Sequence, residues 1–152
     1  MHTTTLLLAL TLWWPLGPPA PDILRPWQPP AGPYAAGHRG IDLAAPEGTT
    51  VHAPATGTVT FAGPVGGRGT LTLTLAGTGT PPLRTTFTPV TPVARTGDHI
   101  RAGDPLATVA PGTHCPRTCL HWGLLRGDQY LDPLTLLRRS PSRLLPLLPL
   151  LR

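Results

Sequence analysis

The residues Thr70–Leu75 alternate threonine and leucine without a break, and this pattern constrains the fold more than any other in the chain. Successive side chains of a β-strand point to opposite faces, so the leucines share one face and the threonines share the other. A strict period of two is the pattern of a half-buried strand. The stretch therefore predicts a strand with one face against a core.

Similar short runs recur along the chain between clusters of glycine and proline. Further strands are predicted at 51–53, 58–61, 84–87, 106–109 and 120–125, with loops at 63–69 and 111–118. Pro89 and Pro92 are expected to end the strand at 84–87, and a turn or short helix at 131–134 is expected to close the domain. Short strands at regular spacing predict an all-β sheet or sandwich. A chain of 152 residues is expected to form one such domain.

The first 20 residues are typical of an export signal. Leu6–Leu16 is apolar and is followed by Gly17–Ala20, but the run is shorter than the roughly 20 residues of a membrane span. We therefore expect residues 1–20 to be a signal peptide, with no stable membrane span after its removal. A secreted or cell-envelope location would place both cysteines where pairing is expected.

Two further segments flank the predicted domain at 37–137. Residues 21–36 are proline-rich and are expected to form an extended arm, because proline restricts both its own φ and the residue before it. Trp27 and Tyr34 are expected to anchor this arm. Residues 138–152 form a leucine- and proline-rich tail that is expected to be poorly ordered.

The charge and the residue inventory exclude several classes of function. The formal charge of +5 favours anionic surroundings, but the 12 arginines are scattered, so we predict no nucleic-acid binding. The only serines are Ser140 and Ser142 in the tail, which argues against a Ser-His-Asp triad. Glu47 is the only glutamate, and no H-E-x-x-H segment occurs. The chain has no asparagine to orient a Cys-His pair.

Histidine and aspartate are what remain for a chemical site. His38 and Asp42 lie four residues apart in a glycine-containing loop, and His121 follows on a predicted strand. Two imidazoles and one carboxylate are the protein ligands of a catalytic zinc site, which keeps a fourth position open. Each histidine is also compatible with an ordinary core or surface position. His52 is assigned to the solvent face of its strand and His99 to a turn.

Five segments in order resemble the M23 family of zinc metallopeptidases, the lysostaphin-like cell-wall endopeptidases. Residues 37–43 are similar to the H-x-G-x-D segment of the family, and residues 46–59 to the strand-turn-strand that follows it. Residues 97–103 resemble the G-D-x-V-x-x-G turn, 120–123 the end of the H-x-H strand, and 132–133 the closing D-P. The resemblance implies a mostly antiparallel β-sheet with the metal in a groove on one face. It also implies peptidoglycan or its cross-link peptides as the partner, in bacteria.

Position by position, the resemblance implies that His38, Asp42 and His121 bind zinc. It also exposes two departures, because the first histidine of H-x-H falls on Cys119 and the histidine of Y-x-H falls on Pro89. In the family these histidines assist catalysis. Loss of a positioned acid–base group costs roughly 100- to 10,000-fold, and loss of an oxyanion partner costs about 100- to 1000-fold. His114 is the candidate for replacing them.

Cys119 has two interpretations. In the first it forms a disulfide with Cys115, which fixes the loop beside the groove and stabilises the fold by about 2 kcal/mol. In the second it is a fourth zinc ligand, because it shares a strand face with His121 and a thiolate binds zinc well. That second arrangement would be a closed, structural site. Expected export favours the disulfide.

Three functions are compatible with these residues. The first is an exported M23-type metallopeptidase that acts on peptidoglycan with a reduced catalytic set. The second is a non-catalytic module that binds peptidoglycan or regulates another hydrolase, and the third is a domain whose zinc is purely structural. Cys119 and Pro89 favour a module of low hydrolytic activity.

Overall fold

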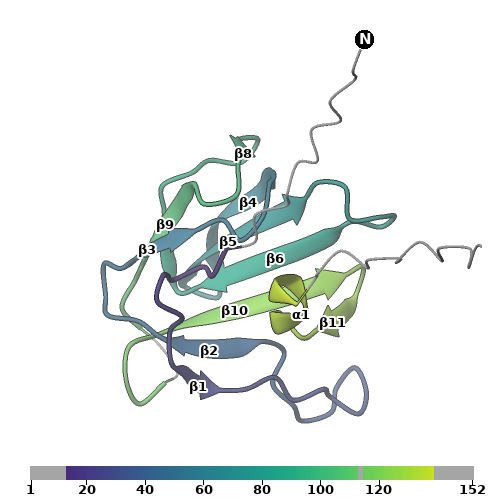
Figure 1. Cartoon of the computed structure of the whole chain (residues 1–152). Coiled ribbons are helices and arrows are strands. Elements are labelled where there is room, and N and C mark those ends of the chain that lie inside the picture. The colour runs from purple at the N-terminus through teal and green to yellow at the C-terminus, as the bar shows by residue number, and fades with distance from the viewer. Residues whose placement is uncertain (1–12, 113–114, 139–152) are drawn as a thin grey trace, which may run out of the picture.

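The computed structural model describes residues 13–112 and 115–138 of the chain (Figure 1). Its elements, in chain order, are β1 (Ile23–Arg25), β2 (Ile41–Ala44), β3 (Thr50–His52), β4 (Gly57–Val65), β5 (Arg68–Leu75), β6 (Leu83–Thr88), β7 (Val90–Pro92), β8 (His99–Ile100), β9 (Pro105–Val109), β10 (Cys119–Arg126), β11 (Gln129–Leu131) and α1 (Leu134–Leu137). Strands thus dominate, and the predicted all-β class is confirmed.

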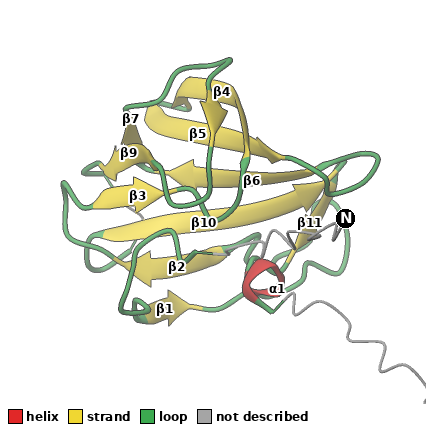
Figure 2. Ribbon diagram, turned by 45° about the horizontal axis from the view of Figure 1, so that its top comes forward, coloured by secondary structure: helices red, strands yellow, loops and turns green. Residues whose placement is uncertain are grey.

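The strands form two antiparallel sheets that share one core. The larger sheet has the order β1-β2-β10-β6-β5-β4-β8, with β11 also paired to β10, and the smaller has the order β3-β9-β7. Figure 2 shows the small sheet beside one end of the large one. Buried side chains from both sheets, including Leu73 of β5, Trp122 of β10 and Leu106 of β9, belong to a single hydrophobic cluster.

The threonine-leucine alternation behaves as predicted. Leu71, Leu73 and Leu75 are all at most 2% exposed on the inner face of β5. The predicted loop at 63–69 is wrong, however, because β4 continues to Val65 and β5 begins at Arg68. A two-residue turn of Gly66 and Gly67 joins them, and both residues have positive φ, +57° and +78°. Tight hairpins with this backbone twist need positive φ at both central positions, which glycine adopts without strain.

Pro89 ends β6 as predicted, but the chain continues as a strand in the other sheet. Proline has no N–H to donate to a sheet ladder and therefore interrupts it. After Pro89, β7 pairs with β9, with Val90 opposite Val109. The proline thus marks the point where the chain passes from the large sheet to the small one.

The proline-rich arm is tied to the domain at one of its two predicted anchors. Its strand β1 pairs with β2, with Ile23 opposite Leu43. Trp27 packs against the hydrophobic core. The prediction that Tyr34 anchors the arm is wrong, because its side chain is fully exposed and has no core to bury against.

Four residues of the predicted export signal are built into the fold. The backbone N–H of Trp13 donates to the carbonyl of Pro54 at 3.0 Å, and that of His52 donates to Pro15 at 2.8 Å. Leu16 is 6% exposed and belongs to the core cluster. Residues 1–12 and 139–152, which hold the first part of the predicted signal and nearly all of the predicted tail, lie outside the described residues.

Trp14, from the same N-terminal segment, contacts β10, the strand that carries His121. The ring of Trp14 lies 6.3 Å from that of Trp122, at an interplanar angle of 58°. Trp122 is fully buried, and its indole N–H donates to the hydroxyl of Thr85 at 2.7 Å. Such tilted aromatic pairs stabilise a fold beyond their buried area. The N-terminal segment therefore packs behind the strand that faces the candidate site.

The chain closes with the short helix predicted near 131–134. The four-residue helix α1 follows the turn at Asp132, whose carboxylate accepts from the backbone N–H of Leu134 at 3.0 Å. Leu136 of this helix is buried in the core. Among the described residues, no helix has the length and apolar character that crossing a membrane requires.

Replacing Leu16 by alanine tests whether the N-terminal segment stabilises the domain. Truncating a buried leucine typically costs about 2–5 kcal/mol, so Leu16→Ala should lower the free energy of unfolding by that amount in urea denaturation. The matched control is Leu24→Ala, because Leu24 is 39% exposed on β1. Equal stability of the two variants would contradict a structural role for the segment.

Candidate metal centre

Two paired strands bring a carboxylate and an imidazole face to face. β2 and β10 run antiparallel, with Asp42 directly opposite His121. Nδ1 of His121 lies 2.8 Å from Oδ1 of Asp42, although the residues are 79 positions apart in the chain. Because a carboxylate oxygen only accepts, the imidazole donates this hydrogen bond in the metal-free chain, and a metal bound by Nδ1 would displace that proton. The pairing register therefore creates the first half of the site.

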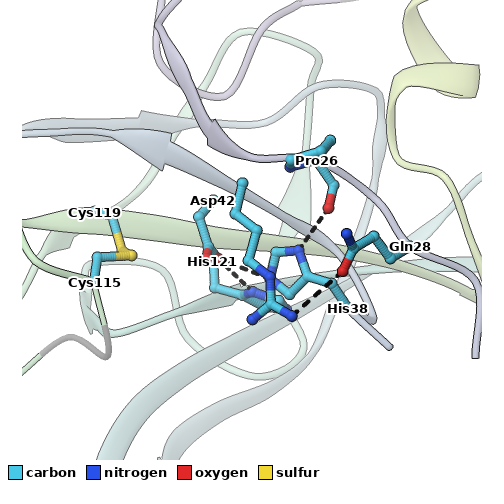
Figure 3. A network of polar contacts seen from close by, with 8 residues as sticks. Pro26, Gln28, His38, Asp42, Cys115, Cys119 and His121 are labelled. Atoms are coloured by element: carbon cyan, nitrogen blue, oxygen red, sulfur yellow. Dashed lines mark hydrogen bonds and ion pairs between the residues drawn. A yellow bond between two sulfur atoms is a disulfide. The ribbon is translucent and has the colours of Figure 1, made fainter. Parts of the chain in front are cut away.

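His38 reaches the same carboxylate from the loop before β2 (Figure 3). Its Nε2 lies 3.2 Å from Oδ1 of Asp42, and its ring centroid is 5.0 Å from that of His121. Its Nδ1 donates to the backbone carbonyl of Pro26 at 2.8 Å. Since the carbonyl can only accept, Nδ1 carries the proton, and in the neutral ring Nε2 keeps the lone pair. A β-bridge between Gln28 and His38 holds the arm in place for this contact.

These three side chains fit a metal ion by position and by donor type. One ligand atom from each of His38, Asp42 and His121 lies within 4.8 Å of the other two. The side chains of His38 and Asp42 are buried, whereas that of His121 is 18% exposed, so the cluster is reached from solvent on one side. Two imidazoles and one carboxylate suit zinc with a position left open. The bond from His38 to Pro26 is the outer contact that commonly orients a metal-binding imidazole.

Gly40 makes room for the site because no side chain fits at its position. A Cβ there would lie 2.4 Å from the carbonyl oxygen of Trp122 and 2.7 Å from Nε2 of His121. The imidazole thus packs directly over the glycine backbone, with its Nδ1 turned to Asp42. This close approach explains why the segment H-x-G-x-D needs glycine at its centre.

The two cysteines form a disulfide in the structure, with Cα atoms 6.1 Å apart. Cys119 begins β10 and is fully buried, and it lies opposite Ala44 of β2. Of the two interpretations of Cys119, the disulfide with Cys115 is the one that the structure contains. A disulfide sulfur is neither a thiolate ligand nor an acid–base group.

Pro89 also lies beside the candidate site. Thr88, the last residue of β6, pairs with His121, and buried Pro89 follows it at once. Cys119 and Pro89, the positions to which the resemblance assigns the two family histidines, are therefore next to the cluster of His38, Asp42 and His121, and neither holds a side chain that can transfer a proton. The Pro89 carbonyl accepts from the backbone N–H of Ala110 at 3.0 Å, so its backbone serves the fold.

The other histidines do not join the cluster of His38, Asp42 and His121 in the described residues. His52 is half-buried rather than solvent-facing, because Nδ1 donates to the carbonyl of Gly103 at 3.0 Å. His99 lies on strand β8 rather than in a turn and is exposed, with Nδ1 3.2 Å from the hydroxyl of Thr58. His114, the candidate for a replacement catalytic group, lies outside the described residues.

Comparison with known proteins agrees with this fold and identifies the family. The family described as Peptidase family M23 matches residues 36–133, and the chain belongs to this family. Uncharacterised proteins of Mycobacterium tuberculosis and Mycobacterium bovis are each 39% identical to it over 142 residues, which is 90% of this chain and 55% of the relative. The chain thus spans about half the length of the curated relatives that it matches.

Solved structures show the same fold at lower identity. A zinc-containing peptidase from Vibrio cholerae superposes with a TM-score of 0.67 at 16% identity, covering 81% of this chain and 39% of that one. The catalytic domain of the antimicrobial peptidase lysostaphin from Staphylococcus simulans superposes with a TM-score of 0.65 at 19% identity. The match covers 78% of this chain and 92% of that domain. The second match covers nearly the whole of that catalytic domain, so the fold of this chain is that of a lysostaphin-type domain.

Substitution of Gly40 by alanine should displace His121 and weaken metal binding. Disturbing the contacts that orient a metal ligand typically costs about 10- to 100-fold in affinity, and we expect that loss for zinc in competition with a chromophoric chelator. Gly32→Ala is the matched control, because nothing lies within 4 Å of a Cβ at that position. Unchanged zinc affinity in Gly40→Ala would contradict the steric role of this glycine.

Proposed function

We propose that this chain is a zinc-binding cell-wall protein that binds the peptide cross-links of peptidoglycan and hydrolyses them only weakly. One observation carries this proposal: a complete set of ligand side chains lies beside two positions, Pro89 and Cys119, that cannot supply acid–base catalysis. Membership of peptidase family M23 supports the cell wall as the place of action.

The proposed ligands are His38, Asp42 and His121. When bound, zinc supplies Lewis acidity that polarises a carbonyl and activates water. The protein contributes the orientation of the ligands, through the Pro26 carbonyl on one imidazole and Gly40 beneath the other. The exposed side of His121 leaves the site accessible to a peptide from solvent.

Proton transfer is the part of the chemistry that these residues do not provide. The sulfur of Cys119 is bonded to Cys115 in the disulfide, and the side chain of Pro89 has no titratable group. Each missing group costs at least about 100-fold in rate. A site of this kind keeps its affinity for a peptide carbonyl while losing most of its hydrolytic rate, which favours binding over cleavage.

Export also remains a proposal, and the packing of Trp13–Leu16 supports a particular form of it. Removal of residues 1–20 would take Leu16 out of the core and Trp14 away from Trp122. We therefore propose that an exported form keeps Trp13 and the residues after it. Secretion or retention in the envelope would bring the chain to peptidoglycan and allow the disulfide to form.

Metal content tests the ligand assignment directly. The purified full chain should retain zinc after dialysis, and His121→Ala and Asp42→Asn should each lose most of it, as measured by elemental analysis. His99→Ala is the control, because this exposed histidine lies outside the cluster. Full zinc retention in both ligand variants would refute the assignment.

A zymogram and a sedimentation assay on purified cell walls separate binding from hydrolysis. We expect the full chain to sediment with peptidoglycan, to lose that binding with a chelator, and to clear little or no wall in the gel. Chelator-sensitive clearing would contradict low activity. If such clearing is abolished by His114→Ala, that histidine replaces the missing groups.

A variant can restore an imidazole that the site lacks, and the zymogram measures its effect. The variant Cys119→His with Cys115→Ser places an imidazole at the first position of H-x-H. Because a positioned acid–base group typically contributes about 100-fold or more, clearing should rise in this variant. The control is Cys119→Ser with Cys115→Ser, which also removes the disulfide but adds no imidazole. Equal clearing by the two variants would refute the account of Cys119.

A further inference from the structure

Asp42 belongs to two groups of potential metal ligands, and only one of them is the site described above. The second group consists of Asp42, Cys115 and Cys119, whose carboxylate oxygen and sulfur atoms lie within 4.8 Å of one another. Asp42 and Cys119 are almost fully buried, at 1% and 0% exposure. The disulfide therefore lies against the same carboxylate that faces His38 and His121 (Figure 3).

The strand register explains this double membership. Asp42 lies opposite His121 on β10, and Cys119 is two residues earlier on the same strand. Residues two apart on a strand share a face, so both side chains lie on the side of Asp42. Ala44, a residue with a small side chain, lies opposite Cys119.

We propose that reduction of the Cys115–Cys119 disulfide creates a second, thiolate-containing metal site around Asp42. A dithiol reductant transfers two electrons and two protons to the disulfide, the S–S bond breaks, and the reductant becomes a disulfide itself. When zinc or a similar metal binds, the two thiols release their protons to solvent. Thiolates are strong ligands for zinc, stronger than the single carboxylate that faces them.

The two donor groups have opposite consequences for access to the metal. In the oxidised chain the ligands are His38, Asp42 and His121, which leave a position for a wall peptide. In the reduced chain both sulfurs join Asp42, and His121, 2.8 Å from that carboxylate, is placed to supply a fourth donor. Four protein donors are the count of a closed structural site. The redox state of the disulfide thus controls whether the metal keeps an open position for a ligand; we call this the redox gate.

This inference rests on the proposed metal site, because Asp42 serves both groups. The test uses the full chain loaded with Co²⁺, whose spectrum reports ligand type. The oxidised protein should show visible ligand-field bands without a sulfur-to-cobalt charge-transfer band in the near ultraviolet. After treatment with a phosphine reductant the charge-transfer band should appear, and Co²⁺ affinity in chelator competition should rise about 10-fold or more.

Serine variants of the two cysteines test which sulfur atoms bind the metal. The variant with Cys115→Ser and Cys119→Ser should bind Co²⁺ as the oxidised chain does and should show no charge-transfer band with or without the phosphine. Each single serine variant should give a weaker band than the reduced chain. His99→Ser, an exposed substitution outside both groups, should change neither spectrum.

The outcomes separate this inference from the proposed function. Ligand-field bands that persist after reduction with no charge-transfer band would overturn the thiolate site and leave the site of His38, Asp42 and His121 standing. A charge-transfer band already present in the oxidised chain would overturn the redox gate. Absence of Co²⁺ binding in the oxidised chain, with a charge-transfer band on reduction, would refute the proposed function and support the thiolate site instead.

Discussion

The pairing of β2 with β10 is the interaction on which the rest of the structure depends. It places a carboxylate that is 1% exposed opposite an imidazole from the far end of the chain. A buried, isolated charge is costly, and Asp42 is tolerated because two imidazoles converge on it. A one-residue slip would turn every side chain of a strand to the other face. In the shifted register His121 would point into the core and Trp122 would be exposed.

The core and the candidate metal centre lie on opposite faces of β10. On β10, His121 points to the ligands while Leu120 and Trp122 are fully buried. Trp122 is fixed by Thr85 on the neighbouring strand and by Trp14 from the N-terminal segment. Packing on one side of the sheet therefore holds the imidazole on the other, and Gly40 completes the arrangement by letting two backbones approach closely.

Much of the fold could be predicted from local patterns. The alternation of Thr70–Leu75 identifies a half-buried strand because burial follows a period of two, and short runs elsewhere behave alike. The hairpin at Gly66–Gly67 was predicted as a longer loop, since a glycine-rich stretch does not reveal where pairing stops. The approach of His38 to His121 depends on long-range pairing, which no local pattern contains, so the family resemblance was needed to connect them.

Two features had no signal that a sequence could provide. The Pro26 carbonyl that orients His38 is a backbone group, and any residue at that position has one. The apolar composition of Trp13–Leu16 suits an export signal and a core-forming segment equally, so composition alone does not reveal that Leu16 is buried in the core.

The short strand β1 has a consequence for how these molecules behave beside one another. It forms an open edge of the large sheet, and its exposed Ile23 and Leu24 are side chains that would favour further pairing. An unpaired edge is a template for strands of other chains. Pro21 and Pro26 stand on either side of β1, and neither has an N–H to extend a ladder. The prolines of the arm would therefore confine pairing at this edge of the sheet to the three residues of β1.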